Sequence, residues 1–239
     1  MEDHDGRTPG VTIVCSDCPR NGKTLFTKLA VDLLLLRHGE TPLIFDTDAP
    51  DGDIIRQFPS HTKIIDLSRT AEQVALFDGI LNAGQGQFVI DLAAHQFTRF
   101  FDIYVDIDFE AGAAELGFDN TVFFLIDRTA ESIQAAASLR KRIPNTRFVP
   151  VRNQAIGDAL DAPGMADLYH KMHCDREIML PALSSETLGM IEHPDFHFDS
   201  FVAGHYGELP FEMKTELWDF LETLYEQRDS VDDGSTFAV

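Results

Sequence analysis

The sequence has 239 residues, of which 44% are hydrophobic and 25% charged, and this length predicts one well-buried globular domain instead of two. Its formal net charge is -21. That charge disfavours direct, non-specific attachment to nucleic acid or to an anionic membrane, because such contacts need clustered Lys and Arg. A basic partner protein suits the charge better.

The sequence carries no apolar run that approaches the length of a transmembrane helix. Residues 1–5 are acidic, unlike the basic start of a secretory signal. The three cysteines indicate no disulfide framework and fit a reducing compartment. We therefore expect a cytoplasmic protein without a membrane span.

A loop at 15–24 separates an apolar strand-like run, Val11–Val14, from a helix-like run, Leu25–Arg37. A strand whose following loop opens directly onto a helix aims several backbone N–H groups at one point. The positive end of the helix dipole points there too, so this arrangement suits a polyphosphate. The segment therefore predicts a phosphate-binding loop.

The loop matches the pattern G-x-x-x-x-G-K-[ST] at Gly22, Lys23 and Thr24, whereas Asp17 replaces its first glycine. Lys23 would reach the β- and γ-phosphates, and the Thr24 hydroxyl would bind Mg²⁺. An ordinary turn before a helix is the alternative, so neighbouring segments must decide between the two.

Two acidic residues follow the second predicted strand, Pro42–Phe45, directly: Asp46 and Asp48. Ligands of open parallel sheets bind outside the carboxyl ends of the strands. We therefore expect both carboxylates near the phosphates, where they suit a metal ion and water. A turn built from Asp and Pro is the alternative.

A third acidic residue ends the apolar run Gln87–Asp91. A buried strand that closes on an aspartate is typical of a Walker B segment, in which the carboxylate holds the Mg²⁺ shell, usually through water. Asp91 could instead cap the next helix. Its place after a strand favours the metal role.

Strands and helices continue to alternate along the rest of the chain. We predict strands at 63–67, 121–126, 147–151 and about 177–180, and helices at 70–82, 97–117, 130–142 and 210–228. This alternation predicts a single three-layer α/β/α domain with a mainly parallel sheet. The domain would span 10–228, between a flexible N-terminus at 1–9 and a flexible tail at 229–239.

The loops after the last two predicted strands also open at the carboxyl edge of the sheet. Asn153 follows one of them, and Pro181 and Ala182 follow the other. The Asn153 amide and the backbone near Pro181 could hold a purine ring there. The alternative is that Asn153 is a turn residue.

The pair Cys15 and Cys18 permits a zinc or redox interpretation, with His170, His173 and Cys174 as the other half. Zinc sites of this kind use tightly spaced ligand pairs on both sides, and here the first pair already lies in the phosphate loop. We therefore do not expect a zinc site.

The order and spacing of these segments resemble the ParA/MinD-like P-loop ATPases of the SIMIBI class. The matching segments are Gly22-Lys23-Thr24, Asp46-Thr47-Asp48-Ala49-Pro50, Val89-Ile90-Asp91, Val151-Arg152-Asn153 and the loop at Pro181. The resemblance implies ATP or ADP and Mg²⁺ as ligands, an ATP-dependent homodimer, and a partner protein that the dimer engages. The segment from Asp91 through the aromatic and acidic helix predicted at 97–117 is also loosely similar to plasmid transfer and stability ATPases of the TraL and StbB types.

The resemblance implies a role for each site residue. By this resemblance, Lys23 would hold the phosphates and Thr24 the metal, while Asp46 and Asp91 would support the water shell of the metal and Asp48 would orient the attacking water. Asn153, Pro181 and Ala182 would contact adenine. The nucleotide-binding loop would be completed by Cys18, Pro19, Asn21, Gly22 and Leu25.

The loop departs from the family pattern K-G-G-x-G-K-[ST]. The leading lysine, which crosses to the other subunit in that family, falls on Cys18, and the two glycines fall on Pro19 and Arg20. We expect Arg20 to supply a substitute positive charge. Pro19 removes one N–H and restricts the backbone, so we expect slow hydrolysis.

We therefore expect a nucleotide-dependent switch that acts in positioning, plasmid partition, or transfer of DNA by conjugation. With this net charge, any DNA contact would be indirect or confined to a local basic patch, and Lys and Arg cluster only at 128, 140–142, 147 and 152. The alternatives are an ATP-dependent ligase or kinase on the same fold, and an ATP-binding adaptor that does not hydrolyse. The three aspartates favour some hydrolysis.

Overall fold

The computed structural model describes residues 8–157, 160, 163–172, 174 and 176–229. The strands are β1 (Gly10–Cys15), β2 (Leu43–Asp46), β3 (Thr62–Ile64), β4 (Gln87–Asp91), β5 (Asp119–Ile126), β6 (Arg147–Asn153) and β7 (Ile178–Leu180). The α-helices are α1 (Lys23–His38), α2 (Thr70–Ala83), α3 (Phe97–Asp106), α4 (Phe109–Glu115), α5 (Ala130–Arg142), α6 (Met165–His170), α7 (Ser185–Ile191), α8 (Phe198–Val202) and α9 (Phe211–Asp229). Short 3-10 helices are η1 (Ile54–Arg56), η2 (Ala94–Gln96) and η3 (Gln154–Ile156). The predicted flexible segments lie almost wholly outside the described residues.

The described strands form one sheet in the order β3-β2-β4-β1-β5-β6-β7. Every neighbouring pair is parallel, which confirms the predicted α/β class. β1 lies at the centre, so the loop that follows it emerges in the middle of the carboxyl edge, where doubly wound sheets bind ligands.

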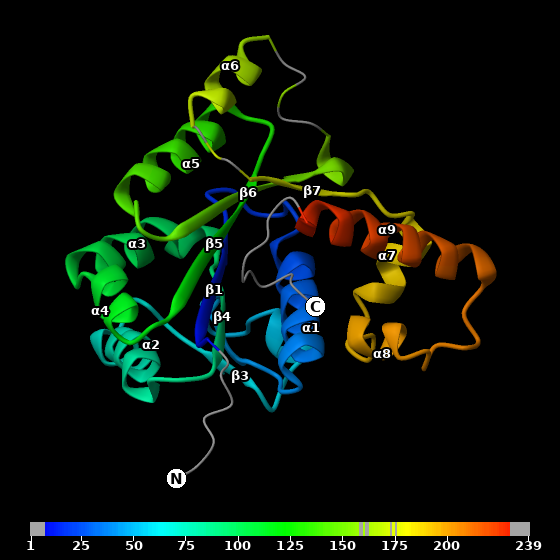
Figure 1. The fold of residues 1–239 in the computed structure, drawn as a ribbon, viewed down its shortest axis with the longest axis horizontal. Coiled ribbons are helices and arrows are strands. Elements are labelled where there is room, and N and C mark those ends of the chain that lie inside the picture. Colours follow the sequence, from blue (N-terminus) through cyan, green and yellow to red (C-terminus); the bar gives the residue numbers. More distant parts are fainter. Residues whose placement is uncertain (1–7, 158–159, 161–162, 173, 175, 230–239) are drawn as a thin grey trace.

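Helices cover both faces of this sheet: α2 to α6 on one, and α1 with α7 to α9 on the other (Figure 1). Successive strand residues point to opposite faces. Val122 and Phe124 of β5 pack on the first face, whereas Phe123 and Leu125 pack on the second. Both faces are buried, which explains the continuous apolar runs in the sequence. The three-layer prediction is confirmed.

The single helix predicted over 97–117 is wrong in detail, because the structure divides it into α3 and α4. Asp108 lies between them with φ of 53°, a left-handed conformation that an α-helix cannot continue through. Three aromatic residues of α3 are buried, with Phe100 and Phe101 fully enclosed and the Tyr104 hydroxyl 2.9 Å from Thr146 Oγ1, whereas Phe97 is partly buried. The segment covers the sheet, as expected.

The last helix, α9, forms where a helix was predicted, and it packs into the core on its face of the sheet. Its buried side chains are Leu217, Phe220 and Leu224, whereas Phe211 is 82% exposed and Trp218 is 48% exposed. Before it, the structure adds α7 and α8, which the sequence analysis did not predict. Among the helices of the described residues, none has the length and apolar character needed to cross a bilayer.

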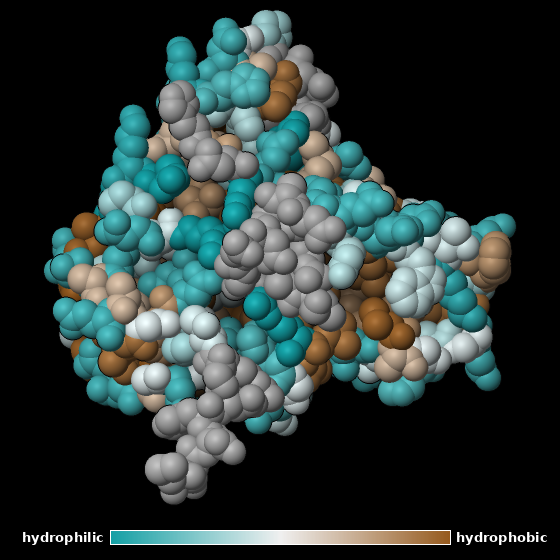
Figure 2. All heavy atoms as spheres, in the orientation of Figure 1, coloured by the Kyte–Doolittle hydropathy of each residue, from teal (hydrophilic) through white to brown (hydrophobic). Residues whose placement is uncertain are grey.

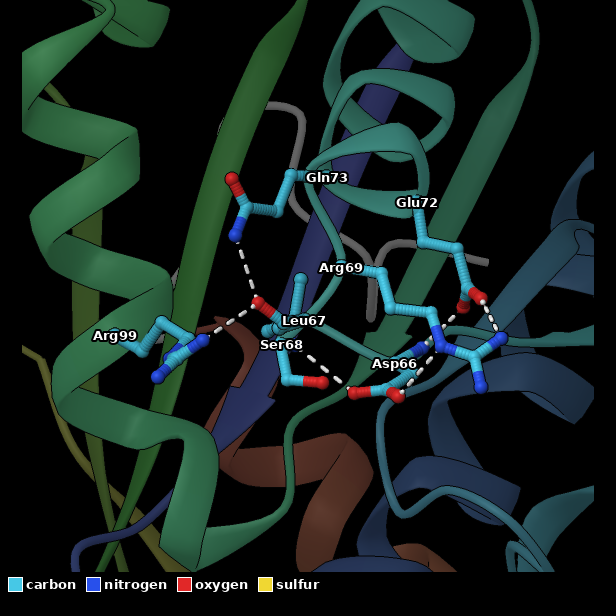
Figure 3. Close-up of polar contacts among 7 residues, drawn as sticks. All are labelled: Asp66, Leu67, Ser68, Arg69, Glu72, Gln73 and Arg99. Atoms are coloured by element: carbon cyan, nitrogen blue, oxygen red, sulfur yellow. Dashed lines mark hydrogen bonds and ion pairs between the residues drawn. The ribbon is translucent and has the colours of Figure 1, made fainter.

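Polar contacts join α2 to α3 at the turn after β3, as Figure 3 shows. The Leu67 carbonyl accepts hydrogen bonds from Gln73 Nε2 at 2.8 Å and from Arg99 Nη1 at 3.1 Å. Arg69 forms an ion pair with Asp66 at 3.2 Å. The bond from Arg99 therefore ties the first turn of α3 to the turn after β3.

Candidate functional site

A cavity of about 1100 Å³ opens at the carboxyl edge of the sheet, at the upper end of the usual size for cofactor sites. The predicted site residues that line it are Pro19, Arg20, Gly22, Lys23, Thr24, Leu25, Asp46, Asp48, Asp91, Asn153 and Pro181. Ala182 instead lines a smaller neighbouring hollow. Cys18 and Asn21 belong to the loop but do not line the cavity. The topology thus brings together residues from five strand ends.

The phosphate loop ends at Gly22, which precedes the first residue of α1 and has φ of 94°. A Cβ at this position would lie 2.6 Å from Asn153 Nδ2, so both conformation and space require glycine. Lys23 and Thr24 follow in the first turn of α1, where free backbone N–H groups and the helix dipole favour an anion. Arg20, at the position of a family glycine, also has a positive φ, 60°.

We expect Gly22→Ala to lower the free energy of unfolding by about 1–2 kcal/mol through backbone strain. The added methyl group would also displace Asn153 from the loop, so binding of the nucleotide predicted from the sequence should fall together with stability. Chemical denaturation and binding titrations measure both. Gly79→Ala, within α2 and with open space around its Cβ, is the control and should stabilise by up to about 1 kcal/mol. Equal effects of the two substitutions would contradict this account.

Side chains brace the loop against β5 and α5. Asn21 Nδ2 donates hydrogen bonds to Ser16 Oγ and, at 3.0 Å, to the Leu125 carbonyl. Asp17 Oδ1 accepts from Ser132 Oγ at 2.6 Å. The aspartate that replaces the first glycine therefore ties the start of the loop to the first turn of α5.

The thiols of the loop have an environment that disfavours the thiolate. Burial, followed by Asp17 and Asp127, raises the pKa of Cys18 to about 11, and burial raises the pKa of Cys15. A neutral thiol is a poor metal ligand and resists oxidation. Within the described residues neither cysteine belongs to a group of three converging metal-ligand side chains; His173 lies outside those residues.

Asp46 and Asp91 lie side by side at the ends of β2 and β4, where they are partners in the strand register. Both are buried. Burial, followed by the Asp46 carboxylate, raises the pKa of Asp91 to about 7, whereas Lys23 and the Thr27 hydroxyl lower it. Thr27 Oγ1 donates to Asp91 Oδ1 at 3.1 Å. Two buried carboxylates this close favour a cation between or beside them.

Asp46 also organises the loop that follows it. Its Oδ1 accepts from the Asp48 N–H at 3.0 Å and its Oδ2 accepts from the Ile54 N–H at 3.2 Å. Burial raises the pKa of Asp46, and these hydrogen bonds oppose the shift. By holding Ile54, Asp46 brings η1 and the residue after it to the cavity, so that Arg56 and Gln57 line it.

Thr47 joins the loops after β2 and β4. Its Oγ1 donates to the Asp91 carbonyl at 3.2 Å and accepts from the Ala93 N–H at 2.8 Å. Next to it, Asp48 is half-exposed, with Oδ1 3.9 Å from His95 Nδ1. His95 also lines the cavity, although no role was assigned to it from the sequence.

Asn153 connects the predicted base end of the site to the phosphate loop. Its Nδ2 donates to the Asn21 carbonyl at 3.0 Å, and its Oδ1 accepts from the Ala155 N–H at 3.0 Å. The amide thus does more than form a turn, because it holds the loop from the end of β6. Contact with adenine stays a prediction.

Lys28 is a further cavity residue that sequence reasoning missed. It is almost fully buried on α1, and its Nζ donates to the Ile191 carbonyl at 2.9 Å and the His193 carbonyl at 3.2 Å. Burial lowers its pKa to about 8. No sequence signal marks Lys28, because its partners lie more than 160 residues away.

The parallel sheet with β1 at its centre, together with the loop that opens onto α1, matches the fold of SIMIBI-class P-loop NTPase structures. Neither a protein-family model nor a curated protein matches the sequence. Among solved structures, a ParA family ATPase from Chlorobium tepidum is similar with a TM-score of 0.54 at 10% identity, over 89% of this chain and 97% of that one.

Two other solved structures are more distant in shape. A nucleotide-binding protein from Archaeoglobus fulgidus in complex with ADP has a TM-score of 0.49 at 14% identity, covering 80% of this chain and 90% of that one. The MinC:MinD cell division protein complex from Aquifex aeolicus has a TM-score of 0.48 at 13% identity, covering 94% and 97%. At such identities the likeness concerns the fold.

Proposed function

We propose that this chain is an ATP-binding, slowly hydrolysing switch ATPase of the ParA/MinD type, which acts in positioning, plasmid partition or DNA transfer through partner proteins. One observation carries the proposal: Lys23 and Thr24 of the predicted phosphate loop line the same cavity as the buried pair Asp46 and Asp91. The fold likeness to a ParA family ATPase supports it.

The residues present suit MgATP. Lys23 and the N–H groups at the start of α1 would hold the phosphates, and Thr24, Asp46 and Asp91 would hold Mg²⁺, partly through water. Mg²⁺, when bound, neutralises charge on the phosphate oxygens. Burial raises the pKa values of Asp46 and Asp91, and carboxylate oxygens are the ligands that a hard cation such as Mg²⁺ prefers.

Asp48 is the residue that we propose orients the attacking water. It lines the cavity from the loop after β2, and its carboxylate is half-exposed. The carboxylate can therefore accept a hydrogen bond from a water molecule and orient it. His95, 3.9 Å away, would help to hold that carboxylate in place. Asn153 and the loop at Pro181 would contact the base.

We expect Arg20→Ala to reduce ATP turnover by about tenfold or more, because Arg20 lines the cavity and its charge would stabilise the phosphate oxygens. Arg20→Gly removes the same charge but relieves the left-handed backbone, so it should also raise the free energy of unfolding by roughly 1 kcal/mol. Steady-state kinetics and denaturation of both variants separate the two effects. Unchanged turnover in both would exclude a role for this charge.

The proposed switch acts as an ATP-dependent homodimer with a partner protein that is basic. Acidic partners occupy much of the basic cluster found in the sequence: Arg142 pairs with Asp102 at 2.7 Å, Arg147 with Asp119 at 3.2 Å and Arg152 with Glu177 at 2.8 Å. This pairing and the net charge support indirect contact with DNA. Tight, salt-sensitive DNA retention in a filter-binding assay of the protein alone would contradict it.

Mg²⁺-dependent ATP binding and turnover by the purified protein test the proposal, with Lys23→Ala as the control for contaminating activity. Slow turnover that this substitution removes is the expected result. Binding without turnover would favour the non-hydrolysing adaptor. Pro19 and the left-handed backbone of Arg20 support this alternative, because both depart from the loop of the hydrolysing family. Absence of both binding and turnover would refute the proposal.

A further inference from the structure

A second polar cluster lies away from the nucleotide cavity, where α8 packs on α1. Asp32 is in the third turn of α1, His197 immediately precedes α8, and Asp199 is in its first turn. A carboxylate oxygen of each aspartate and a nitrogen of the imidazole all lie within 4.8 Å of one another. In the described part of the chain, this is the one group of three such side chains that converge in this way.

Asp32 has an unsatisfied oxygen at the centre of this cluster. The side chain has no exposed surface, and its Oδ2 accepts from the Phe198 N–H at 2.6 Å. Its Oδ1 accepts no hydrogen bond from the described residues, and His197 Nδ1 lies 3.6 Å away. A buried carboxylate oxygen without a hydrogen bond is costly, so this oxygen needs a cation beside it, and among the described side chains His197, when protonated, forms an ion pair with it.

The nearby lysine does not fill that role. Lys28 lies one turn before Asp32 on α1, but its ammonium group donates to the Ile191 and His193 carbonyls. The edge-on contact of the His197 ring with Phe58, 5.1 Å between centroids, limits the rotation of the imidazole. His197 and Asp199 are partly exposed, so the cluster has an open side through which an ion can enter.

We propose that Asp32, His197 and Asp199 bind a divalent first-row transition metal ion, with Zn²⁺ as the best match. Two carboxylate oxygens and one imidazole nitrogen are ligands that zinc accepts, with water in the fourth position. Mg²⁺ and Ca²⁺ prefer oxygen ligands alone. None of the three residues lines the nucleotide cavity, so this site is separate from the proposed MgATP site.

The ion would link two parts of the chain that are far apart in sequence. Asp32 belongs to the helix that starts at the phosphate loop, whereas His197 and Asp199 belong to the segment between β7 and α9. Figure 2 shows hydrophobic areas where α7 and α8 lie beside α1, and Leu29 and Phe198 are buried in the same core. The metal would strengthen that apolar contact with a directional bond and raise the stability of the whole domain.

Zn²⁺ titration of the full chain, after removal of metal with a chelator, tests the site. We expect calorimetry to show one Zn²⁺ per chain, with a rise in Tm that the chelator reverses. Co²⁺ in place of Zn²⁺ should give visible absorption bands on the same binding curve. Asp199→Asn and His197→Gln should each weaken binding at least about tenfold and abolish the metal-dependent rise in Tm.

The pair His193 and Asp195 provides a matched control. Its atoms lie 3.5 Å apart, but both side chains are exposed, and it has no buried carboxylate. His193→Gln and Asp195→Asn should leave Zn²⁺ binding unchanged, as should Asp91→Asn in the nucleotide site. Asp199 is partly exposed, so its variant should fold, and its Tm without metal checks this. The proposal would be overturned if the wild type showed no saturable Zn²⁺ binding, or if the Asp199 and His197 variants bound Zn²⁺ as tightly as the wild type.

Discussion

Lys23→Ala is expected to abolish measurable ATP turnover, with a loss of about 100-fold or more, and to weaken ATP binding. Lys23 is the first residue of α1 and lines the cavity. Its ammonium group is the charge that would hold the β- and γ-phosphates. It also lowers the pKa of Asp91, so its removal would favour the protonated form of the carboxylate that we propose supports Mg²⁺.

Steady-state turnover and titration with ATP measure this effect. Lys63→Ala is the matched control, since Lys63 is an exposed residue of β3 that does not line the cavity, and it should behave as the wild type. The Tm of each variant without nucleotide shows whether the fold is intact. Normal turnover by a folded Lys23→Ala protein would mean that the phosphate site is elsewhere.

Asp91→Asn should abolish Mg²⁺-dependent turnover and yet stabilise the protein without nucleotide. The folded state raises the pKa of Asp91 from 3.8 to about 7, so between these values it retains a proton that the unfolded chain has lost. Stability of the wild type therefore falls as pH rises through this window. Above it, the buried carboxylate is ionised next to Asp46, and asparagine would remove a cost on the order of 2–4 kcal/mol.

The pH dependence distinguishes this mechanism from general stabilisation. The gain of Asp91→Asn should be largest at pH 8 and vanish below about pH 4, as measured by chemical denaturation across the range. Added Mg²⁺ and ATP should stabilise the wild type more than the variant. Asp78→Asn, at an exposed position of α2, should show neither effect. A pH-independent gain for Asp91→Asn would exclude ionisation of this carboxylate as its cause.

The sheet could be predicted because its strands are buried on both faces and therefore read as short apolar runs between helical segments. The helices α7 and α8 could not, because they contain only 7 and 5 residues, too few turns for a helical period to be visible. Long-range bonds hold them instead, such as that from Phe198 N–H to Asp32. The break at Asp108 was missed because an aspartate rarely adopts a left-handed conformation.

Site residues could be predicted where their position at the end of a strand was enough to place them at the edge of the sheet. Lys23, Thr24 and Asp91 could be assigned to one edge because parallel strands all end there. The bond from Asn153 to the Asn21 carbonyl joins residues 132 positions apart, and no local pattern records it. Likewise, Arg56 lines the cavity because the loop after β2 folds back so that the Ile54 N–H bonds to Asp46, and the local sequence does not indicate this.

The hydroxyl of Thr47 couples the movements of the loops after β2 and β4. It bonds to both the carbonyl and the N–H groups that bracket the start of the second loop. A displacement of that loop must therefore break both bonds or carry Asp48 with it. Asp48 lies on the loop after β2 and His95 on the loop after β4. Movement of either residue's loop should therefore shift the other residue as well.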